Sequence, residues 1–241
     1  MIKVHSFETL GTHEGPGIRS VIFTQGCNLK CIYCHNPDTQ CMNGGKEYSN
    51  DDIIKFVLKS KSYYGKKGGL TISGGEPLLQ AKEFIPIFKK IKELGYTTVI
   101  DTSGSILNND VKELLNHTDL VLLDVKEFDN IAHKKLTGIS NNKIIEFAKY
   151  LEDNKIPMWI RYVLMPTYSD NLNHIEEMGK HFSDYKMIER LEILPYHTLG
   201  VHKYKELNIE YKAKDIQPPT IECIENAKKV FSKYLDNIFI R

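Results

Sequence analysis

Apolar and polar residues follow two periods along the chain, one typical of β-strands and one typical of helices. Short runs rich in β-branched residues predict strands, and apolar residues three and four positions apart predict helices. The predicted strands cover Ile18–Gln25, Gly69–Ser73, Thr97–Asp101, Leu120–Val125, Met158–Met165 and Ile188–Leu194, with a short last strand at Asn237–Ile240. The predicted helices cover Asn50–Tyr64, Lys82–Leu94, Asn109–Leu115, Asn142–Glu152, Ile175–Phe182 and Thr220–Leu235.

Strands that alternate with helices predict parallel pairing through right-handed crossovers. Six strand–helix units are too few for a closed eight-stranded barrel, but they suit an open, partial barrel or a doubly wound sheet. We predict the α/β class and a single-domain, open partial (β/α)6 barrel with parallel strands. Because no linker, repeat or low-complexity tract divides the chain, this domain is expected to span residues 1–241.

Candidate functional residues follow the carboxyl ends of the predicted strands, where the active sites of α/β folds lie. Three cysteines follow the first strand, a Gly-Gly-Glu-Pro run follows the second, and polar residues follow three of the others. The segments are Cys27–Cys34, Gly74–Pro77, Asp101-Thr102, Asp124–Lys126 and Pro195–His197.

Charge and hydropathy exclude several classes of partner. Lys and Arg number 32 against 31 Asp and Glu, so no excess charge selects nucleic acid or an acidic membrane surface. No apolar run approaches the about 18 residues that a membrane-spanning helix needs, and the N-terminal residues lack the pattern of a secretory signal. We therefore expect a cytoplasmic protein with no nucleic-acid or membrane partner.

The cysteines carry the most specific signal in the sequence. Of five, three form the run Cys27-x3-Cys31-x2-Cys34, within a predicted loop at 26–36, and the others are Cys41 and Cys223. A tight cluster in a reducing compartment indicates metal binding or redox chemistry rather than a disulfide framework. Three thiolates on an iron–sulfur cubane leave one iron open to a ligand.

Other interpretations of the cysteines exist. Structural zinc is normally held by four ligands, and His35 or Cys41 would supply the fourth. Free cysteine is also common in protein cores, although seldom in such clusters. A plain electron carrier is disfavoured because the usual ferredoxin run is spaced differently and its cluster is fully ligated.

Ordered motifs along most of the chain resemble those of one enzyme family. The cysteine run, with Tyr33 before its last member, together with Ser73-Gly74-Gly75-Glu76-Pro77, is similar to the radical S-adenosylmethionine superfamily. Further motifs narrow this to the glycyl-radical-enzyme activases. They are Gly15-Pro16-Gly17-Ile18-Arg19, Phe23-x-Gln25-Gly26-Cys27, Tyr33-Cys34-His35-Asn36-Pro37, Asp101-Thr102, Leu123-Asp124-Val125-Lys126, Trp159-Ile160-Arg161-Tyr162 and Leu194-Pro195-Tyr196-His197.

The resemblance implies two cofactors, a 4Fe–4S cluster and S-adenosylmethionine. One electron passes from the reduced cluster to the sulfonium, the C–S bond breaks, and the 5′-deoxyadenosyl radical takes hydrogen from a glycine Cα of a partner enzyme. No side chain is expected to act as a catalytic acid, base or nucleophile, because the protein holds and orients a cofactor that carries the chemistry.

The resemblance also implies roles for individual residues. Cys27, Cys31 and Cys34 would ligate the cluster. From the residues themselves, glycines at 74 and 75 let the backbone approach a ligand closely, with a plain turn as the alternative. Arg161, charged on an apolar strand, predicts an inward charge that faces a carboxylate inside the pocket, with a surface ion pair as the alternative. The expected S-adenosylmethionine site comprises Tyr33, His35, Gly74, Gly75, Glu76, Asp124, Val125, Lys126, Arg161 and His197. A monovalent cation would be held by Asp101, Thr102, Leu122 and Asp124.

The partner is inferred from what the chain lacks. Only Cys41 lies between Cys34 and Ser73, so the ferredoxin module that some activases insert there is missing. This favours a glycyl-radical enzyme of the pyruvate formate-lyase type as protein substrate. Separately, we expect flavodoxin or ferredoxin as electron donor and a monomeric activase. The alternative is a radical S-adenosylmethionine enzyme that acts on a small molecule.

Overall fold

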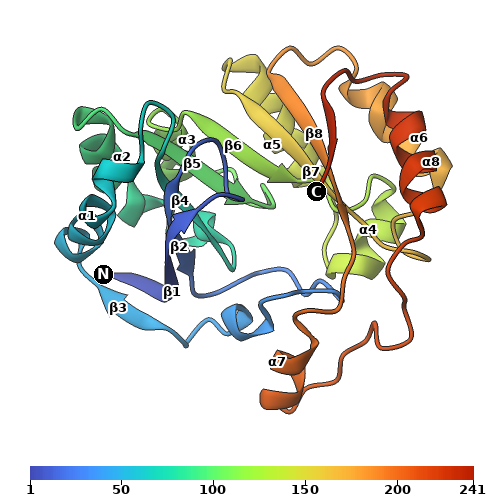
Figure 1. Ribbon diagram of the computed structural model, residues 1–241, viewed down its shortest axis with the longest axis horizontal. Helices are drawn as coiled ribbons and strands as arrows, with labels where there is room; N and C mark the ends of the chain where they lie inside the picture. The colour runs from blue at the N-terminus through green and yellow to red at the C-terminus, as the bar shows by residue number, and fades with distance from the viewer. The chain divides into compact units, whose positions relative to one another are not determined.

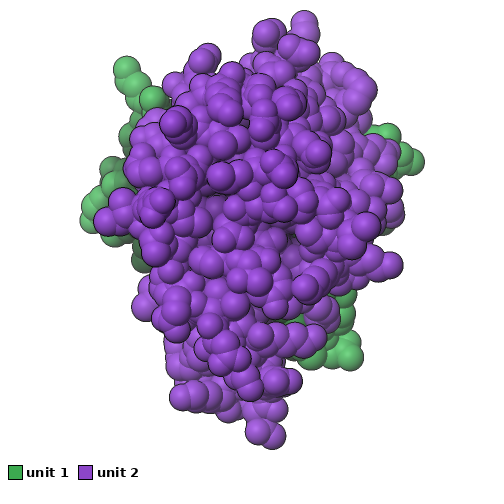
Figure 2. Space-filling view, turned by 90° about the vertical axis from the view of Figure 1, so that its right-hand side faces the viewer, with its two compact units in different colours: residues 1–28, 39–122 green, residues 29–38, 123–241 purple.

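Strands and helices alternate along the chain as the periodicity predicts. The computed structural model describes residues 1–241. They divide into two units, which Figure 2 distinguishes by colour: unit 1 comprises residues 1–28 and 39–122, and unit 2 comprises residues 29–38 and 123–241. The prediction of one domain over the whole chain is not tested by this division. No helix in either unit is long and apolar enough to cross a membrane.

Unit 1 is built on strands that hydrogen-bond in the order β3-β1-β2-β4-β5-β6. Strand β2 pairs in parallel with β4, and β4 pairs in parallel with β5, whereas β1 runs antiparallel to β2 and β3. The strands are β1 (Ile2–Gly11), β2 (Arg19–Thr24), β3 (Lys46–Tyr48), β4 (Gly69–Gly74), β5 (Thr97–Thr102) and β6 (Leu120–Asp124). The last two residues of β6 belong to unit 2.

Helices α1 (Asn50–Lys59), α2 (Ala81–Glu93) and α3 (Asn109–Leu115) flank these strands (Figure 1). Helix α1 starts at a capping box in which Ser49 and Asp52 each bond the other's backbone amide, and this satisfies two donors that a helix start leaves open. Its Ile53 and Val57 are buried. The unit also holds 3-10 helices at Lys61–Tyr63 and Pro77–Gln80 and the second half of one at Pro37–Gln40.

Unit 2 has the parallel strand order β7-β8-β9. Helices α6 and α8 pack against each other and lie side by side in Figure 1. The elements are α4 (Asn130–Thr137), α5 (Asn142–Asp153), β7 (Met158–Leu164), α6 (Leu172–Phe182), β8 (Ile188–Pro195), α7 (Val201–Glu206), α8 (Ile221–Phe231) and β9 (Ile238–Ile240).

The α/β class, the parallel pairing and all six principal strands are confirmed. Strands β1 and β3 and helices α4 and α7 are not predicted from the sequence, because polar residues interrupt their apolar periods or because they are short. Helix α1 ends at Lys59 rather than continuing to Tyr64, since the chain tightens there into a 3-10 turn. Helix α8 likewise ends at Phe231.

A fully buried arginine ties three strands of unit 1 together at their amino ends. Arg19, the first residue of β2, donates six hydrogen bonds of 2.6–3.1 Å. Burial lowers the pKa of Arg19 to about 10, against the raising effects of Tyr64, Asp119 and Glu14. The acceptors are the carbonyls of Pro16, Lys67, Leu70 and Thr97 and the hydroxyls of Thr71 and Thr97.

The substitution Arg19→Met should lower the free energy of unfolding by about 3 kcal/mol or more, because it leaves several buried acceptors without a donor. Urea denaturation measures the change. The control Lys89→Met removes an exposed cation paired with Glu113 and should change stability little, because exposed ion pairs contribute little. Equal effects of the two substitutions would contradict the role of Arg19.

Candidate functional site

The glycine motif of unit 1 is hydrogen-bonded to the backbone that leads into Cys27. The amide of Gly75 donates to the Thr24 carbonyl at 3.0 Å, and the amide of Glu76 donates to the Gly26 carbonyl at 2.8 Å. On the other side, the amide of Gly26 donates to the Thr39 carbonyl at 2.8 Å. The start of the cysteine loop and the glycine motif therefore share one hydrogen-bonded backbone.

This contact requires glycine at both positions. A Cβ on Gly75 would lie 2.1 Å from the Gly26 carbonyl oxygen, and one on Gly74 would lie 2.3 Å from the Thr24 nitrogen. Gly74 also has a φ of +107°, which favours glycine. The missing side chains let two backbone segments of the protein approach each other closely, and the approach of a ligand to these glycines stays a prediction.

Glu76 is buried and its carboxylate is fully occupied by the chain. One oxygen accepts from the Thr102 hydroxyl at 2.5 Å and the Leu78 amide at 3.1 Å. The other accepts from the amide and hydroxyl of Ser103 at 3.0 and 2.5 Å. Burial raises the pKa of Glu76, and these hydrogen bonds oppose the rise. With four donors on two oxygens, Glu76 positions the loop after β5, and its role toward the cofactor stays a prediction.

The residues predicted for a cation are engaged in contacts of their own. Asp101 accepts from the Ser73 hydroxyl at 2.7 Å. The Thr102 hydroxyl donates to Glu76 and accepts from the Gly104 amide at 2.9 Å. Leu122 is buried in β6 of unit 1, and in unit 2 Asp124 pairs with Lys126 at 2.8 Å. The cation site stays a prediction.

In unit 2, helix α4 holds the part of the cysteine loop that carries Cys31 and Cys34. The amides of Lys30 and Ile32 donate to the carbonyls of Thr137 and Leu136 at 2.8 and 3.1 Å. The Cys34 amide closes a turn onto the Cys31 carbonyl at 3.2 Å. All five cysteines are thiols, not disulfides.

The segment after β8 holds the same loop from another direction. Tyr204 donates to the Cys34 carbonyl at 2.9 Å, and Lys203 pairs with Asp38 at 3.1 Å and bonds Asn36 at 2.8 Å. The rings of His35 and His197 stack with centroids 4.1 Å apart.

His35 and His197, both predicted for the cofactor, are thus in direct contact within unit 2. The His35 ring nitrogen also lies 3.0 Å from the His197 carbonyl oxygen. Burial lowers the pKa of His35, so its ring is neutral at pH 7. A neutral, stacked ring can present a flat face or a hydrogen bond to a ligand without carrying charge.

Tyr33, Asp124 and Lys126 form a second group of predicted residues in unit 2. Lys126 is mostly buried and lies 5.8 Å from the centre of the Tyr33 ring. Burial disfavours its charge, but Asp124, Tyr33 and Cys31 together raise the pKa of Lys126 well above its usual value. Lys126 therefore keeps a positive charge in the surroundings of Cys31.

Arg161 faces a carboxylate of its own chain. Its Nε lies 3.7 Å from Glu192, the residue beside it on β8. Glu192 is fully buried and also pairs with Arg190 and Arg241 at 3.4 and 3.2 Å. The inward charge predicted from the sequence is present, and Glu192 is one carboxylate that it meets. Val125 is buried, and its amide donates to the Arg161 carbonyl at 3.1 Å.

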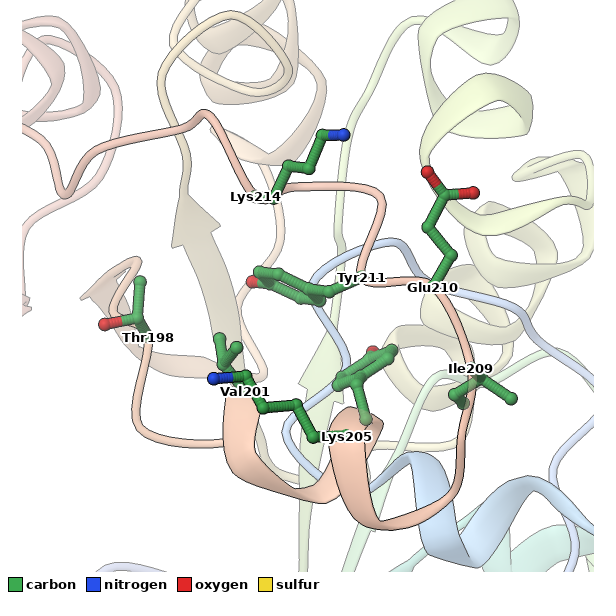
Figure 3. Close-up of a pocket in the computed structure, with 8 residues that line it drawn as sticks. Thr198, Val201, Lys205, Ile209, Glu210, Tyr211 and Lys214 are labelled. Atoms are coloured by element: carbon green, nitrogen blue, oxygen red, sulfur yellow. The ribbon is translucent and has the colours of Figure 1, made fainter.

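A pocket of about 410 Å³ opens in unit 2 beside the segment that holds the cysteine loop (Figure 3). The ring of Tyr211 lies between Lys214 on one side and Lys205 on the other. Tyr204, which donates to the Cys34 carbonyl, also lines the pocket. The remaining lining residues are Thr198, Val201, Ile209 and Glu210.

Several residues around the cysteine loop are not predicted from the sequence. Ser103 and Ser105 follow β5 in a polar run that begins at Asp101, and this continuation was a usable signal. Asn28 occupies an unspecified position within the cysteine run, and Lys203 and Tyr204 lie far from it in the chain, so these three gave no signal. Their roles appear only when the fold is known.

The chain resembles proteins of known family along nearly its whole length. The Radical SAM superfamily matches residues 21–179. A pyruvate formate-lyase-activating enzyme of Staphylococcus epidermidis is 45% identical over 93% of this chain and 92% of its own, and that of Staphylococcus aureus (strain USA300) is 44% identical over the same shares.

Solved structures share the fold at lower identity. Streptococcus suis SuiB bound to its precursor peptide SuiA has a TM-score of 0.70 at 19% identity, over 92% of this chain and 48% of SuiB. A domain of a Bacteroides vulgatus pyruvate-formate lyase-activating enzyme has a TM-score of 0.61 at 23% identity, over 72% of this chain and 99% of that one. The open, partial α/β barrel predicted from the sequence agrees with these likenesses.

The fold and the cysteine loop define a radical S-adenosylmethionine protein, and the chain belongs to that superfamily. Its cofactors are therefore a 4Fe–4S cluster and S-adenosylmethionine. Within the superfamily, the chain belongs to the family of pyruvate formate-lyase-activating enzymes.

The residues present fit these cofactors. The thiols of Cys31 and Cys34 are half-buried on a loop held at both sides, and the buried charge of Lys126 favours thiolates nearby. The Tyr33 hydroxyl is buried without a hydrogen-bond partner. Since buried polar groups are seldom left unpaired, this hydroxyl suits a ligand that is bound beside the loop.

The substitution Gly75→Ala should reduce both bound iron and thermal stability, because its Cβ would push the Gly26 backbone that leads into Cys27. Iron analysis and a melting curve measure the two effects. Gly65→Ala is the matched control, since it adds backbone strain at φ +55° but meets nothing within 4 Å. Normal iron content in Gly75→Ala would show that the shared backbone does not position the cysteine loop.

Proposed function

We propose that this protein is an activase that generates a glycyl radical in a partner enzyme of the pyruvate formate-lyase type. The observation that supports this most is the 44–45% identity over 93% of the chain to enzymes of that name, together with three thiols on a loop held from both sides. We further propose that the protein is cytoplasmic and monomeric and receives its electron from flavodoxin or ferredoxin.

In this proposal Cys27, Cys31 and Cys34 each ligate one iron of the cluster. When bound, the cluster would supply the one electron for reductive cleavage of S-adenosylmethionine, and the hydrogen atom removed would come from a glycine Cα of the partner. The protein's own residues hold and orient the reactants and exclude water.

The remaining predicted residues would serve the S-adenosylmethionine. We propose that the backbone of Gly74 and Gly75 faces its methionine end and that Tyr33, His35 and His197 border its adenosine. Asp124, Val125 and Lys126 would lie near the ribose, and Arg161 would complete the pocket wall. The same proposal includes a monovalent cation held by Asp101, Thr102, Leu122 and Asp124. In this proposal Glu76 acts by positioning, so the hydrogen bonds that its carboxylate accepts from the protein are consistent with it.

The decisive experiment is anaerobic reconstitution with iron, sulfide, S-adenosylmethionine and dithionite in the presence of pyruvate formate-lyase. A glycyl radical should appear by electron paramagnetic resonance, and deuterium placed on the target glycine should appear in 5′-deoxyadenosine. Transfer of hydrogen from a small metabolite, with none from any lyase, would instead place the protein in the small-molecule class.

Cysteine variants complete this test. Cys27→Ala, Cys31→Ala and Cys34→Ala should each abolish cluster assembly and radical formation, because each removes one of three ligands. The matched variants Cys41→Ala and Cys223→Ala should keep both. Loss of the cluster in Cys41→Ala would indicate a site with four cysteines and would contradict the open iron on which the proposal depends.

A further inference from the structure

A series of hydrogen-bonded side chains connects buried Glu76, through buried Ser103 and Ser105, to the half-buried residue that follows Cys27. The side-chain nitrogen Nδ2 of Asn28 donates to the Ser105 hydroxyl oxygen at 3.0 Å. The hydroxyl oxygens of Ser105 and Ser103 lie 3.1 Å apart, and the Ser103 hydroxyl donates to Glu76 at 2.5 Å. All of these residues belong to unit 1.

The carboxylate of Glu76 determines which atom the Ser103 hydroxyl donates to. A serine hydroxyl has one proton, and the buried carboxylate of Glu76 is the strongest acceptor available to Ser103. Ser105 can then donate to Ser103 while it accepts from Asn28. The Ser105 hydroxyl also lies 3.2 Å from the side-chain oxygen of Asn28, so both polar atoms of the Asn28 side chain contact Ser105. Hydrogen bonds in such a series strengthen one another.

Glu76 therefore reaches both neighbours of Cys27. Through its own backbone amide it donates to the carbonyl of Gly26 at 2.8 Å. Through Ser103 and Ser105 its side chain holds Asn28. Cys27 lies between two residues that are tied to one glutamate of the glycine motif.

We propose that Asn28, Ser103 and Ser105 are positioning residues that make the place of Cys27 depend on the glycine motif. This inference rests on the proposed function, in which Cys27 ligates the cluster and the glycine motif faces the methionine end of S-adenosylmethionine. This series of hydrogen bonds then fixes the position of the open iron relative to the methionine site. A ligand that shifts the glycine motif therefore also acts on the cluster.

The test compares Ser105→Ala with the wild type after anaerobic reconstitution. Iron content should stay near the wild-type value, because all three cysteines remain. The affinity for S-adenosylmethionine should fall by up to roughly tenfold, which corresponds to the loss of about one hydrogen bond, and the change that this ligand causes in the electron paramagnetic resonance spectrum of the reduced cluster should shrink. Ser105→Thr, which keeps the hydroxyl, should restore both readouts.

A double-mutant cycle distinguishes one chain from separate contacts. Asn28→Ala combined with Ser105→Ala should weaken binding no more than either single substitution, because both remove the same connection. Ser183→Ala removes an exposed hydroxyl bonded to the Lys180 carbonyl and should change nothing. Additive losses in the double variant, or wild-type affinity and spectrum in Ser105→Ala, would overturn the inference.

If Ser105→Ala fails to load iron, hydrogen exchange of the protein without cofactors tests whether Ser105 holds Asn28. The Asn28 amide should then exchange faster than in the wild type while the β4 and β5 amides keep their rates, and unchanged exchange at Asn28 would overturn the inference. The proposed function is tested separately. A wild type that does not bind S-adenosylmethionine contradicts that function, whereas a failure limited to the variants contradicts only the positioning role.

Discussion

Two backbone hydrogen bonds between the glycine motif and the end of β2 are the constraint on which the site in unit 1 depends. They bring the amides of Gly75 and Glu76 onto the carbonyls of Thr24 and Gly26, which is possible only because residues 74 and 75 have no side chain. The motif that would bind the methionine end and the loop that begins at Cys27 are consequently one structural element. Arg19 fixes the same strands at their opposite end.

In unit 2, the cysteine loop is held by hydrogen bonds to helix α4 and to Tyr204. Its part of the cysteine loop has no regular structure of its own, so helix α4 takes up the amides of Lys30 and Ile32, and Tyr204 bonds the carbonyl of Cys34. Lys126 supplies a buried positive charge where thiolates and a negatively charged cluster need one. In both units the side chains hold and orient, which is the share of the work that a protein performs when a cofactor carries the reaction.

The sequence predicts the six principal strands and the positions of the functional loops, because β-branched runs and carboxyl-end placement are local signals. It predicts the cysteines and the glycines for the same reason. It does not predict the hydrogen-bond partners of individual side chains, such as the contacts of Thr102, Ser103 and Leu78 with the carboxylate of Glu76. Short elements such as α4 and α7 are not predicted, because tertiary contacts stabilise them and their sequences show no clear apolar period.

The central claim is that the glycine motif and the entry to the cysteine loop form one cooperative unit before any cofactor binds. Native-state hydrogen exchange of the cofactor-free protein tests it most directly, since amides that open together share one free energy of opening. The account predicts that the amides of Gly26, Gly75 and Glu76 exchange with the same free energy of opening and respond equally to added denaturant. Exchange of Gly75 and Glu76 at the rate of an exposed loop, while Gly26 stays protected, would contradict it.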